Sequence, residues 1–422
     1  MSPLSSQEIL LTSSPDGPIT AYDSSSGVVL TNFAAIRSPR QGLVLVGQTS
    51  FAASNICPIT ASSSIKLYNW WSSSTFFNIP VPEPVGPLAA SSDGAFLFAG
   101  SISGSLYVIS LPSGDILNSF ASHSKPVSCL NVSEDDSLLI SGSDDGTIVV
   151  LPIFQVVSST LTSKNNVGNL ALNKFIAHSG PVTAATFGTS LCNSQVISSS
   201  MDRTIKFWSL LRGILLSSVS FPCPIMSFVL DPTETGFYGA GSDGSIYKGW
   251  VQIGKNVKHV NGNELIRLTE NHNSSIISLV MVNNGRNLVS ASEDGSVWMW
   301  ELDYGQVAMA LRNGNKISDL VVARGISYMK GNGNGNGVRV SINNCGNWGG
   351  GFSGEELVRS GLAEKNVMKI EEVISEVEND KRRAIDMLES SIFLYERLLE
   401  LMLKEAEGEC STTELVKKED IN

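Results

Sequence analysis

Short runs of alternating apolar and polar residues, separated by acidic or glycine-rich turns, occupy most of the chain before residue 325. The clearest run is Ile197–Trp208, with the sequence ISSSMDRTIKFW. Its first half alternates as one strand would, Asp202-Arg203 makes a tight turn, and Thr204–Trp208 alternates as a second strand. Two short antiparallel strands cannot bury their apolar faces alone. The hairpin therefore predicts that further copies occur in the chain.

The same hairpin pattern recurs six more times. The closest copies are SASEDGSVWMW, SGSDDGTIVVL and GAGSDGSIYKG, and the weaker ones are FAGSISGSLYVI, SSPDGPITAY and TASSSIKLY. Successive turns lie 41 to 57 residues apart. A period of about 40–45 residues with a glycine-rich turn and an aromatic ending resembles the WD40 repeat, which forms one four-stranded blade of a β-propeller. The fold is therefore predicted to be all-β, with a seven-bladed WD40 propeller in residues 1–325.

Several parts of this propeller depart from the repeat. The first blade lacks an innermost strand, and residues 316–322 (KISDLVV) are predicted to supply it and so close the ring without exposed edges. The second blade, Gly42–Trp71, has poorly defined inner strands, and the proline run Pro80–Pro84 is predicted to link it to the third. Two polar insertions, Ile153–Lys174 and Gln252–Asn271, are predicted to lie on the surface and to carry specificity.

The chain changes character after the propeller. Residues 326–354 are rich in Gly and Asn and predict a linker, although VRVSI within them looks like a strand. The repeated GNGNGNG produces GxGxxG matches by repetition alone and does not indicate a phosphate site. Residues 355–407 have apolar side chains at a 3-4 spacing, which predicts a long heptad α-helix or coiled coil, about 75 Å long if 50 residues are helical. Residues 408–422 are predicted to be a disordered tail.

The heptad seam is the predicted site of association. Its main apolar members are Val367, Ile370, Ile374, Val377, Leu388, Tyr395, Leu398 and Met402. Pairing with a second copy, as a homodimer, or with a partner helix is favoured, and folding back onto the propeller stays open. The pair Trp70-Trp71 either packs between blades or forms an exposed anchor for a partner, because Trp is enriched at interface hot spots.

Composition narrows the class of partner. Of 422 residues, 42% are hydrophobic and 16% charged, and the net charge is −11. An acidic chain is poorly suited to broad phosphate-backbone binding, so any RNA contact is expected to be indirect or local. The six cysteines are scattered without a CxxC spacing, which is typical of reduced, intracellular proteins. Neither a secretory signal nor an apolar run long enough for a membrane span is apparent.

Three of the four histidines, His123, His178 and His272, each precede the inner strand of a blade. In WD40 repeats such a His forms a hydrogen-bonded tetrad with a strand Ser, the turn Asp and the Trp. The predicted tetrads, with Ser198 and Ser290 as the alternative serines, are His178, Ser200, Asp202 and Trp208 in the fifth blade and His272, Ser292, Asp294 and Trp300 in the seventh. The fourth blade has His123 and Asp145 but Leu151 in place of Trp.

These Ser, His and Asp residues superficially match a hydrolase triad. They recur at structural positions, once per blade, and no GxSxG context accompanies them, so they are predicted to satisfy buried polar groups. His259 stands alone and no HExxH motif is present. No catalytic residue, no cofactor and no metal site is therefore predicted.

A more specific resemblance lies in the middle of the chain. LLSSVSFPCPIMSFVLDPTETGFY, followed by GAGSDGSIY, and the earlier LAASSDGAFLFAGSISGSLYVISLPSGDIL look like the WD-repeat subunit of the rixosome, including its plant members. That nucleolar complex acts in maturation of the large ribosomal subunit precursor. The resemblance implies a non-catalytic scaffold of the nucleolus and nucleoplasm. Its partners would be the other rixosome subunits, pre-60S particles and the machinery for pre-rRNA spacer processing, and its C-terminal helix would dimerise. The alternative keeps the fold but predicts a substrate adaptor for a ubiquitin ligase or a chromatin complex.

Overall fold

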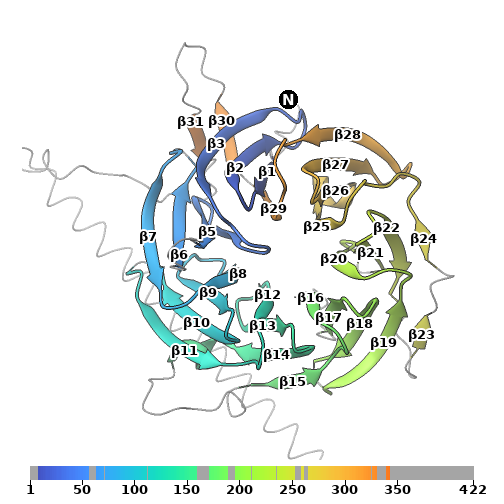
Figure 1. The fold of residues 1–422 in the computed structure, drawn as a ribbon, viewed down its shortest axis with the longest axis horizontal. Helices are drawn as coiled ribbons and strands as arrows, with labels where there is room; N and C mark the ends of the chain where they lie inside the picture. Colours follow the sequence, from blue (N-terminus) through green and yellow to red (C-terminus); the bar gives the residue numbers. More distant parts are fainter. Residues whose placement is uncertain are drawn as a thin grey trace, which may run out of the picture. The chain divides into compact units, whose positions relative to one another are not determined.

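The computed structural model describes residues 8–342 apart from 57–62, 71, 112, 159–170, 189–194, 211, 234, 252–257, 261–264, 325 and 330–338. Seven antiparallel sheets lie around a central axis in this part of the chain (Figure 1). The predicted all-β, seven-bladed propeller is therefore confirmed. The residues of the predicted long helix, 355–407, and of the tail, 408–422, lie outside the described residues, so the coiled coil stays a prediction.

Each blade is built from four strands that follow one another from the propeller axis outward. The first blade contains β29 (Asp319–Ala323), β1 (Ile9–Ser13), β2 (Gly17–Asp23) and β3 (Val29–Ile36). The second contains β4 (Leu43–Val46), β5 (Ser50–Ile56), β6 (Ser63–Asn69) and β7 (Thr75–Val81). The third contains β8 (Val85–Ala90), β9 (Phe96–Ser101), β10 (Ser105–Ser110) and β11 (Ile116–Ala121). The fourth contains β12 (Val127–Val132), β13 (Leu138–Ser143), β14 (Thr147–Pro152) and β15 (Asn173–Ile176).

The remaining blades follow the same order with two additions. The fifth contains β16 (Val182–Phe187), β17 (Gln195–Ser200), β18 (Thr204–Ser209), β19 (Ile214–Ser220) and a short parallel fifth strand, β23 (Lys258–Val260). The sixth contains β20 (Ile225–Leu230), β21 (Gly236–Gly241), β22 (Ile246–Trp250) and β24 (Ile266–Arg267). The seventh contains β25 (Ile276–Val282), β26 (Asn287–Ser292), β27 (Ser296–Glu301) and β28 (Gln306–Arg312), with a 3-10 turn, η3 (Asn283–Gly285), after β25.

The two ends of the propeller meet in the first blade. β29 pairs antiparallel with β1, with Leu11 opposite Val321, and starts three residues later than the expected 316–322. The hydroxyls of Ser13 and Ser318 lie 3.0 Å apart at the start of this pairing. The Asp319 carboxylate also accepts a hydrogen bond from the Leu43 backbone N–H at 3.2 Å. The closing strand is therefore bonded to its own blade and to the next.

One expectation for the second blade was wrong, because its inner strands are regular and β4, β5, β6 and β7 form a complete sheet. The proline run holds in part. Pro80 belongs to β7, an outer strand, where a missing N–H leaves no neighbouring strand unpaired, and Pro82–Pro84 link β7 to β8 as expected. The acidic turn is absent from this blade, yet β6 keeps the alternation of a strand, with Ser63, Ile65 and Leu67 buried and Ser64 and Lys66 less buried between them.

The core is divided among the seven blade-to-blade contacts. Each contact buries a cluster of aliphatic and aromatic side chains from two neighbouring blades. Between the first and second blades the cluster is aromatic, with the Phe51 and Tyr68 rings stacked 5.1 Å apart and Phe33 edge-on to Phe51 at 4.8 Å. Because neither face of a blade is left bare, each of the seven sheets depends on its neighbours.

The insertions and the linker are more ordered than expected. α1 (Ile153–Ser158) begins the first insertion and buries Ile153 and Val156 against the third and fourth blades, instead of forming a polar loop. The second insertion supplies β23 and β24. Within 326–354, β30 (Ile326–Met329) pairs antiparallel with β31 (Arg339–Ile342), so the first part of the predicted linker contains a two-stranded sheet.

Candidate functional site

The fifth blade brings the polar residues of the opening hairpin together around His178. Trp208 Nε1–H donates to Ser198 Oγ at 3.2 Å, and Ser198 Oγ lies 2.8 Å from His178 Nε2. His178 Nδ1 lies 2.9 Å from the Asp202 carboxylate. Because a carboxylate only accepts, Nδ1 carries the imidazole proton, and Nε2 accepts from the Ser198 hydroxyl. All four side chains therefore share one continuous chain of donors and acceptors.

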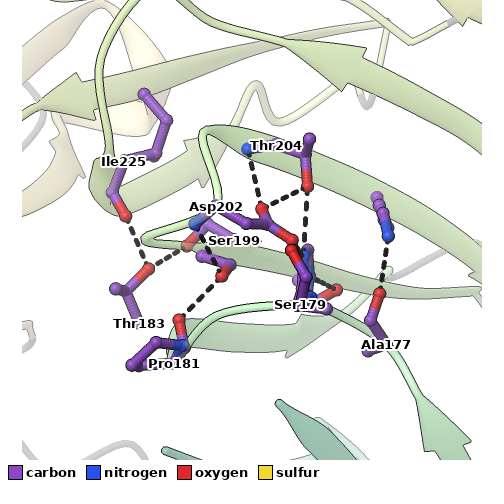
Figure 2. A network of polar contacts seen from close by, with 12 residues as sticks. Ala177, Ser179, Pro181, Thr183, Ser199, Asp202, Thr204 and Ile225 are labelled. Carbon is purple, nitrogen blue, oxygen red and sulfur yellow. Dashed lines mark hydrogen bonds and ion pairs between the residues drawn. The ribbon is translucent and has the colours of Figure 1, made fainter.

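Asp202 also organises the turn that contains it. Its second carboxylate oxygen accepts the Thr204 backbone N–H at 3.0 Å and the Thr204 hydroxyl at 2.6 Å (Figure 2). The Ser179 backbone N–H donates to the first oxygen at 3.1 Å. The carboxylate therefore ties the loop before the inner strand to the turn between the second and third strands.

The serine expected in this tetrad, Ser200, is not the one that binds the histidine. Ser200 Oγ donates to the Pro181 carbonyl at 2.8 Å and accepts the Asp202 N–H at 3.0 Å. Ser198 and Ser200 lie on the same face of β17, about 7 Å apart along the strand. Sequence alternation therefore cannot distinguish them, and the depth reached by the His178 ring selects Ser198.

The seventh blade repeats the arrangement with one extra member. Trp300 Nε1–H donates to Ser290 Oγ at 2.8 Å, and Ser290 lies 2.7 Å from His272 Nε2. His272 Nδ1 lies 2.8 Å from Ser296 Oγ, which in turn donates to Asp294 at 2.6 Å. Asp294 therefore reaches the histidine through Ser296 rather than directly.

The expected serine is again displaced in the seventh blade. Ser292 bonds the carbonyls of Ser274 and Ser275, at 3.3 and 3.2 Å, and not His272. It occupies the same place beside the turn as Ser200, two residues from the serine that reaches the histidine. Ser290 is thus the tetrad member.

The fourth blade contains an incomplete version. His123 Nε2 lies 2.9 Å from Ser141 Oγ, and His123 Nδ1 lies 2.8 Å from Thr147 Oγ1, which donates to Asp145 at 2.6 Å. Leu151 stands where the other two blades have Trp, so no indole N–H reaches Ser141. Comparison of the fourth and seventh blades therefore shows what the indole N–H contributes to the stability of a blade.

The electrostatics fit neutral imidazoles beside ionised carboxylates. Burial lowers the pKa of His123 and of His272 to about 4, and burial also lowers the pKa of His178 against the opposing effect of Asp202. Burial alone would raise the pKa of Asp202, but hydrogen bonds from His178 and Thr204 hold it well below its usual range. The hydrogen bonds assigned to His178 place a proton on Nδ1 and none on Nε2, and an imidazole with one ring proton is neutral.

This arrangement is unsuited to nucleophilic catalysis. Ser198 and Ser290 are 0% exposed, and each hydroxyl is already bonded to both an imidazole and an indole. A nucleophile must approach a substrate carbon while its base is free to take the proton. Neither serine can do so without opening its blade, so the tetrads orient turns and satisfy buried polar groups.

Two blades use a different polar contact that the sequence did not reveal. Tyr107 donates to Glu83 at 2.5 Å in the third blade, and Tyr247 donates to Asp243 at 2.8 Å in the sixth. Both tyrosines lie on the third strand of the blade, and both blades begin with a Pro-x-Pro sequence in place of the His-containing loop. That shared sequence feature could have identified them.

Trp70, for which an exposed anchor was one of two alternatives, is not a surface residue. Its side chain is 4% exposed and packs on Phe51, with the ring centroids 5.3 Å apart. Of the two alternatives for this pair, packing between blades therefore holds for Trp70. Trp71 and the heptad residues Val367, Ile370, Ile374, Val377, Leu388, Tyr395, Leu398 and Met402 lie outside the described residues.

Exposed apolar side chains lie on the outer strands of six blades, with single ones such as Ile176 of β15, Ile214 of β19 and Ile266 of β24, and with pairs on the second and third blades. β3 exposes Val29, β7 exposes Phe76 and Phe77, and β11 exposes Ile116 and Leu117. Neither β3, β7 nor β11 contains a charged residue. Uncharged edge strands with exposed apolar side chains are places where other chains can associate.

The described residues offer little for metal or membrane chemistry. Among them, no group of three or more His, Cys, Asp or Glu side chains is arranged to hold a metal ion. In the same part of the chain, the structure contains no helix with the length and apolar character needed to cross a membrane. Cys129 and Cys223 are free thiols.

Comparison with known proteins places this propeller in a family. A family model described as the neurobeachin β-propeller domain matches residues 82–348. ROOT INITIATION DEFECTIVE 3 of Arabidopsis thaliana is 33% identical over 293 residues, which are 69% of this chain and 66% of that protein. The chain belongs to the WD40-type β-propeller family that this model describes, and it is similar to ROOT INITIATION DEFECTIVE 3. The family resemblance noted in the sequence is thereby confirmed.

Other members of this WD40 family are more distant. Human WD repeat-containing protein 18 is 28% identical over 53% of this chain and 51% of its own length. The pre-rRNA-processing protein crb3/ipi3 of Schizosaccharomyces pombe is 26% identical over 53% of this chain and 57% of its own. The chain thus spans between about half and just under two thirds of these relatives. A computationally designed protein, Ika8, matches with a TM-score of 0.52 at 20% identity over 73% of this chain and 85% of its own, and indicates the fold alone.

Proposed function

We propose that this chain is a non-catalytic scaffold subunit of a rixosome-type complex, acting in pre-60S maturation and pre-rRNA spacer processing. The observation that carries the proposal is the similarity of the propeller to proteins named for pre-rRNA processing, together with 33% identity to ROOT INITIATION DEFECTIVE 3. The partners would be the other subunits and, through them, pre-60S particles. The site of action would be the nucleolus and nucleoplasm.

The location of the polar side chains supports a scaffold role. The Ser, His and Asp residues that could suggest catalysis are buried inside blades and fully occupied in holding turns. Three of the outer strands, β3, β7 and β11, contain no charged residue and expose apolar side chains, and they are called the apolar rim below. The net charge of −11 favours protein partners over direct, extended contact with rRNA. Homodimerisation through the heptad segment remains part of the proposal.

Purification of the tagged chain from nuclear extract tests the assignment. Large-subunit assembly factors and spacer-containing pre-rRNA should be recovered, and depletion of the chain should cause such precursors to accumulate. Recovery of cullin or chromatin subunits without ribosome assembly factors would favour the adaptor alternative and contradict the proposal.

A pair of surface variants sharpens the same experiment. Phe76→Lys changes an exposed side chain on β7, whereas Tyr304→Lys changes one that is 74% exposed on the seventh blade. Both should melt like the unmodified protein, because neither side chain is buried. Loss of assembly factors only with Phe76→Lys would assign the apolar rim to partner binding. Equal recovery with both variants would remove the rim from the proposal and leave the family-based function standing.

A further inference from the structure

An Asn-Gly pair lies in the loop that leads to the closing strand of the propeller. Asn313 and Gly314 follow β28, the outer strand of the seventh blade, and the chain then continues to β29 in the first blade. Figure 1 shows β29 beside β1, where the two ends of the ring meet. Asn-Gly is the sequence most prone to spontaneous loss of a side-chain amide, because glycine has no Cβ to hinder attack by its backbone nitrogen on the preceding Asn side chain.

The local geometry leaves the reacting nitrogen free. Gly314 is exposed and, its two chain neighbours apart, no heavy atom lies within 4 Å of the point where a Cβ would stand. Its backbone N–H takes part in none of the hydrogen bonds found among the described residues, whereas the Asn313 N–H donates to the Gly295 carbonyl at 2.8 Å. The Gly314 nitrogen can therefore lose its proton and move toward the Asn313 side chain without giving up a hydrogen bond of its own.

The Asn313 side chain is tied to the first blade. Its amide Nδ2 donates to Thr12 Oγ1 at 3.3 Å, and Thr12 is 0% exposed in β1. At the other end of the same loop, the Ser318 N–H donates to the Ser13 carbonyl at 2.9 Å. Asn313 is thus one of the residues that join the last blade to the first.

The second Asn-Gly pair among the described residues lacks the free space. Asn284 precedes Gly285 in η3 and has a left-handed conformation, with φ +54° and ψ +39°. A Cβ on Gly285 would stand 2.3 Å from the Pro232 ring, so this part of the backbone packs against the sixth blade. Pro232 therefore restricts the backbone rotation that attack on the Asn284 side chain requires. The other four Asn-Gly pairs of the chain lie outside the described residues.

We propose that Asn313–Gly314 is a spontaneous deamidation site whose conversion weakens the contact between the last and first blades. The deprotonated Gly314 nitrogen attacks Asn313 Cγ, a new C–N bond forms, and the side-chain nitrogen leaves as ammonia. Water then opens the five-membered succinimide at either carbonyl, which leaves aspartate or isoaspartate at this position. The reaction consumes one water, releases one ammonia and needs neither an enzyme nor an oxidant. It depends on this loop alone and not on the complex in which the chain works.

Both products alter the closure of the ring. A carboxylate cannot donate to Thr12 Oγ1, and it adds a negative charge beside the turn that contains Glu293 and Asp294. Isoaspartate also inserts one carbon into the backbone between two hydrogen-bonded points, the Asn313 N–H and the Ser318 N–H. The pairing of β29 with β1 should therefore open more often in the deamidated chain.

Peptide mapping of the aged full chain tests the chemistry. The purified protein is incubated at neutral pH and physiological temperature and digested at mildly acidic pH, so that the digestion adds little deamidation. Mass spectrometry detects the exchange of the amide for a carboxyl group, and electron-transfer fragmentation distinguishes isoaspartate from aspartate. We expect Asn313 to convert at least tenfold faster than Asn284, with isoaspartate among the products. No conversion of Asn313, or conversion no faster than that of Asn284, would overturn the assignment.

Matched variants connect the chemistry to ring closure. Asn313→Gln keeps an amide donor but would have to close a six-membered ring, so it should stay unconverted, and Asn284→Gln is the control for the second pair. On ageing, hydrogen exchange of β29 and β1 should become at least threefold faster in the parent chain and in Asn284→Gln, and should change less than twofold in Asn313→Gln. Equal acceleration in Asn313→Gln would assign the loosening to another site and refute the link to closure.

A third variant covers the case in which Asn313→Gln itself disturbs the loop. Asn313→Asp is one of the two products, and it can be measured fresh, without ageing. Its β29 amides should exchange faster than those of the fresh parent chain, because the donor to Thr12 is lost. Exchange identical to that of the fresh parent chain, both in Asn313→Asp and in the aged protein, would show that conversion leaves the closure intact and would contradict the proposal.

Discussion

The contribution of the tetrad indole can be measured within this chain, because the fourth and seventh blades share the His, Ser and Asp of the tetrad and only the seventh has the Trp. Ser141 and Ser290 are both 0% exposed, and each lies within 2.9 Å of a histidine Nε2. Each also lies 3.5 Å from a carbonyl on the neighbouring strand. Only Ser290 accepts an indole N–H, at 2.8 Å from Trp300. Removing the hydroxyl therefore leaves one more buried donor unsatisfied in the seventh blade than in the fourth.

The expected magnitudes follow from that count. Ser141→Ala leaves His123 Nε2 without a partner and should destabilise the protein by about 1–2 kcal/mol. Ser290→Ala leaves both His272 Nε2 and the Trp300 indole unpaired and should cost about 2–4 kcal/mol. Urea unfolding followed by Trp fluorescence measures both, with reversibility checked first because large domains often unfold irreversibly.

A double substitution separates the indole from the rest of the site. In Ser290→Ala, the further change Trp300→Phe removes the orphaned N–H and should cost about 1 kcal/mol less than the same change in the unmodified chain. Equal costs for Ser141→Ala and Ser290→Ala, with no coupling between Ser290 and Trp300, would refute the account of the tetrad as a chain of satisfied donors.

Three further predictions concern stability. Arg203 occupies a left-handed turn position (φ +66°), and the corresponding residue of the fourth blade is Gly146 (φ +79°). Arg203→Gly should therefore stabilise the chain by about 0.5–1 kcal/mol, and Gly146→Ala should destabilise it by about 1–3 kcal/mol. A lower unfolding free energy for Arg203→Gly in urea would contradict this. Trp70→Ala should cost about 3–5 kcal/mol through the cavity it leaves, whereas an interface anchor would lose partner recovery at an unchanged unfolding midpoint. Burial holds the pKa of His123 and His272 near 4, below the unfolded value of 6.5, so the unfolded state binds more protons between these two pH values. The free energy of unfolding should therefore fall as the pH drops from 6.5 to 4, by at most about 3 kcal/mol per histidine. His272→Asn should reduce this pH dependence in unfolding measured at stepped pH, and an unchanged dependence would contradict the prediction.

The repeated hairpin was sufficient to predict the number of blades and the WD40 fold, because a propeller repeats the same four-strand unit once per blade. It was insufficient for the second blade. There the turn signal is lost, while Ser63, Ile65 and Leu67 of β6 keep a buried alternation. A search guided by the acidic turn therefore underestimates a blade whose strands are specified by packing.

The tetrad serines illustrate a different limit of sequence reasoning. Alternation places Ser198 and Ser200 on one face but cannot say how deep the His178 side chain reaches into the blade. The distance is set by the loop before β16, whose path depends on the Asp202 carboxylate bonding Ser179. A tertiary contact, invisible in the local pattern, therefore selects the serine.

The cavity that lies along the propeller axis, lined by inner strands of several blades, could not be anticipated from the sequence for a related reason. Glu134 and Asp319 are 185 residues apart in the chain, and each belongs to a local pattern that has its own explanation, a turn in one case and a strand start in the other. Only ring closure through β29 brings a carboxyl group from the last inner strand to the same lumen as the turn after β12. In a propeller, residues that line the axis come from several blades, so the lining of the axis is assembled by the closure of the ring. The tetrad residues that the repeat makes conspicuous are buried and hydrogen-bonded inside the blades.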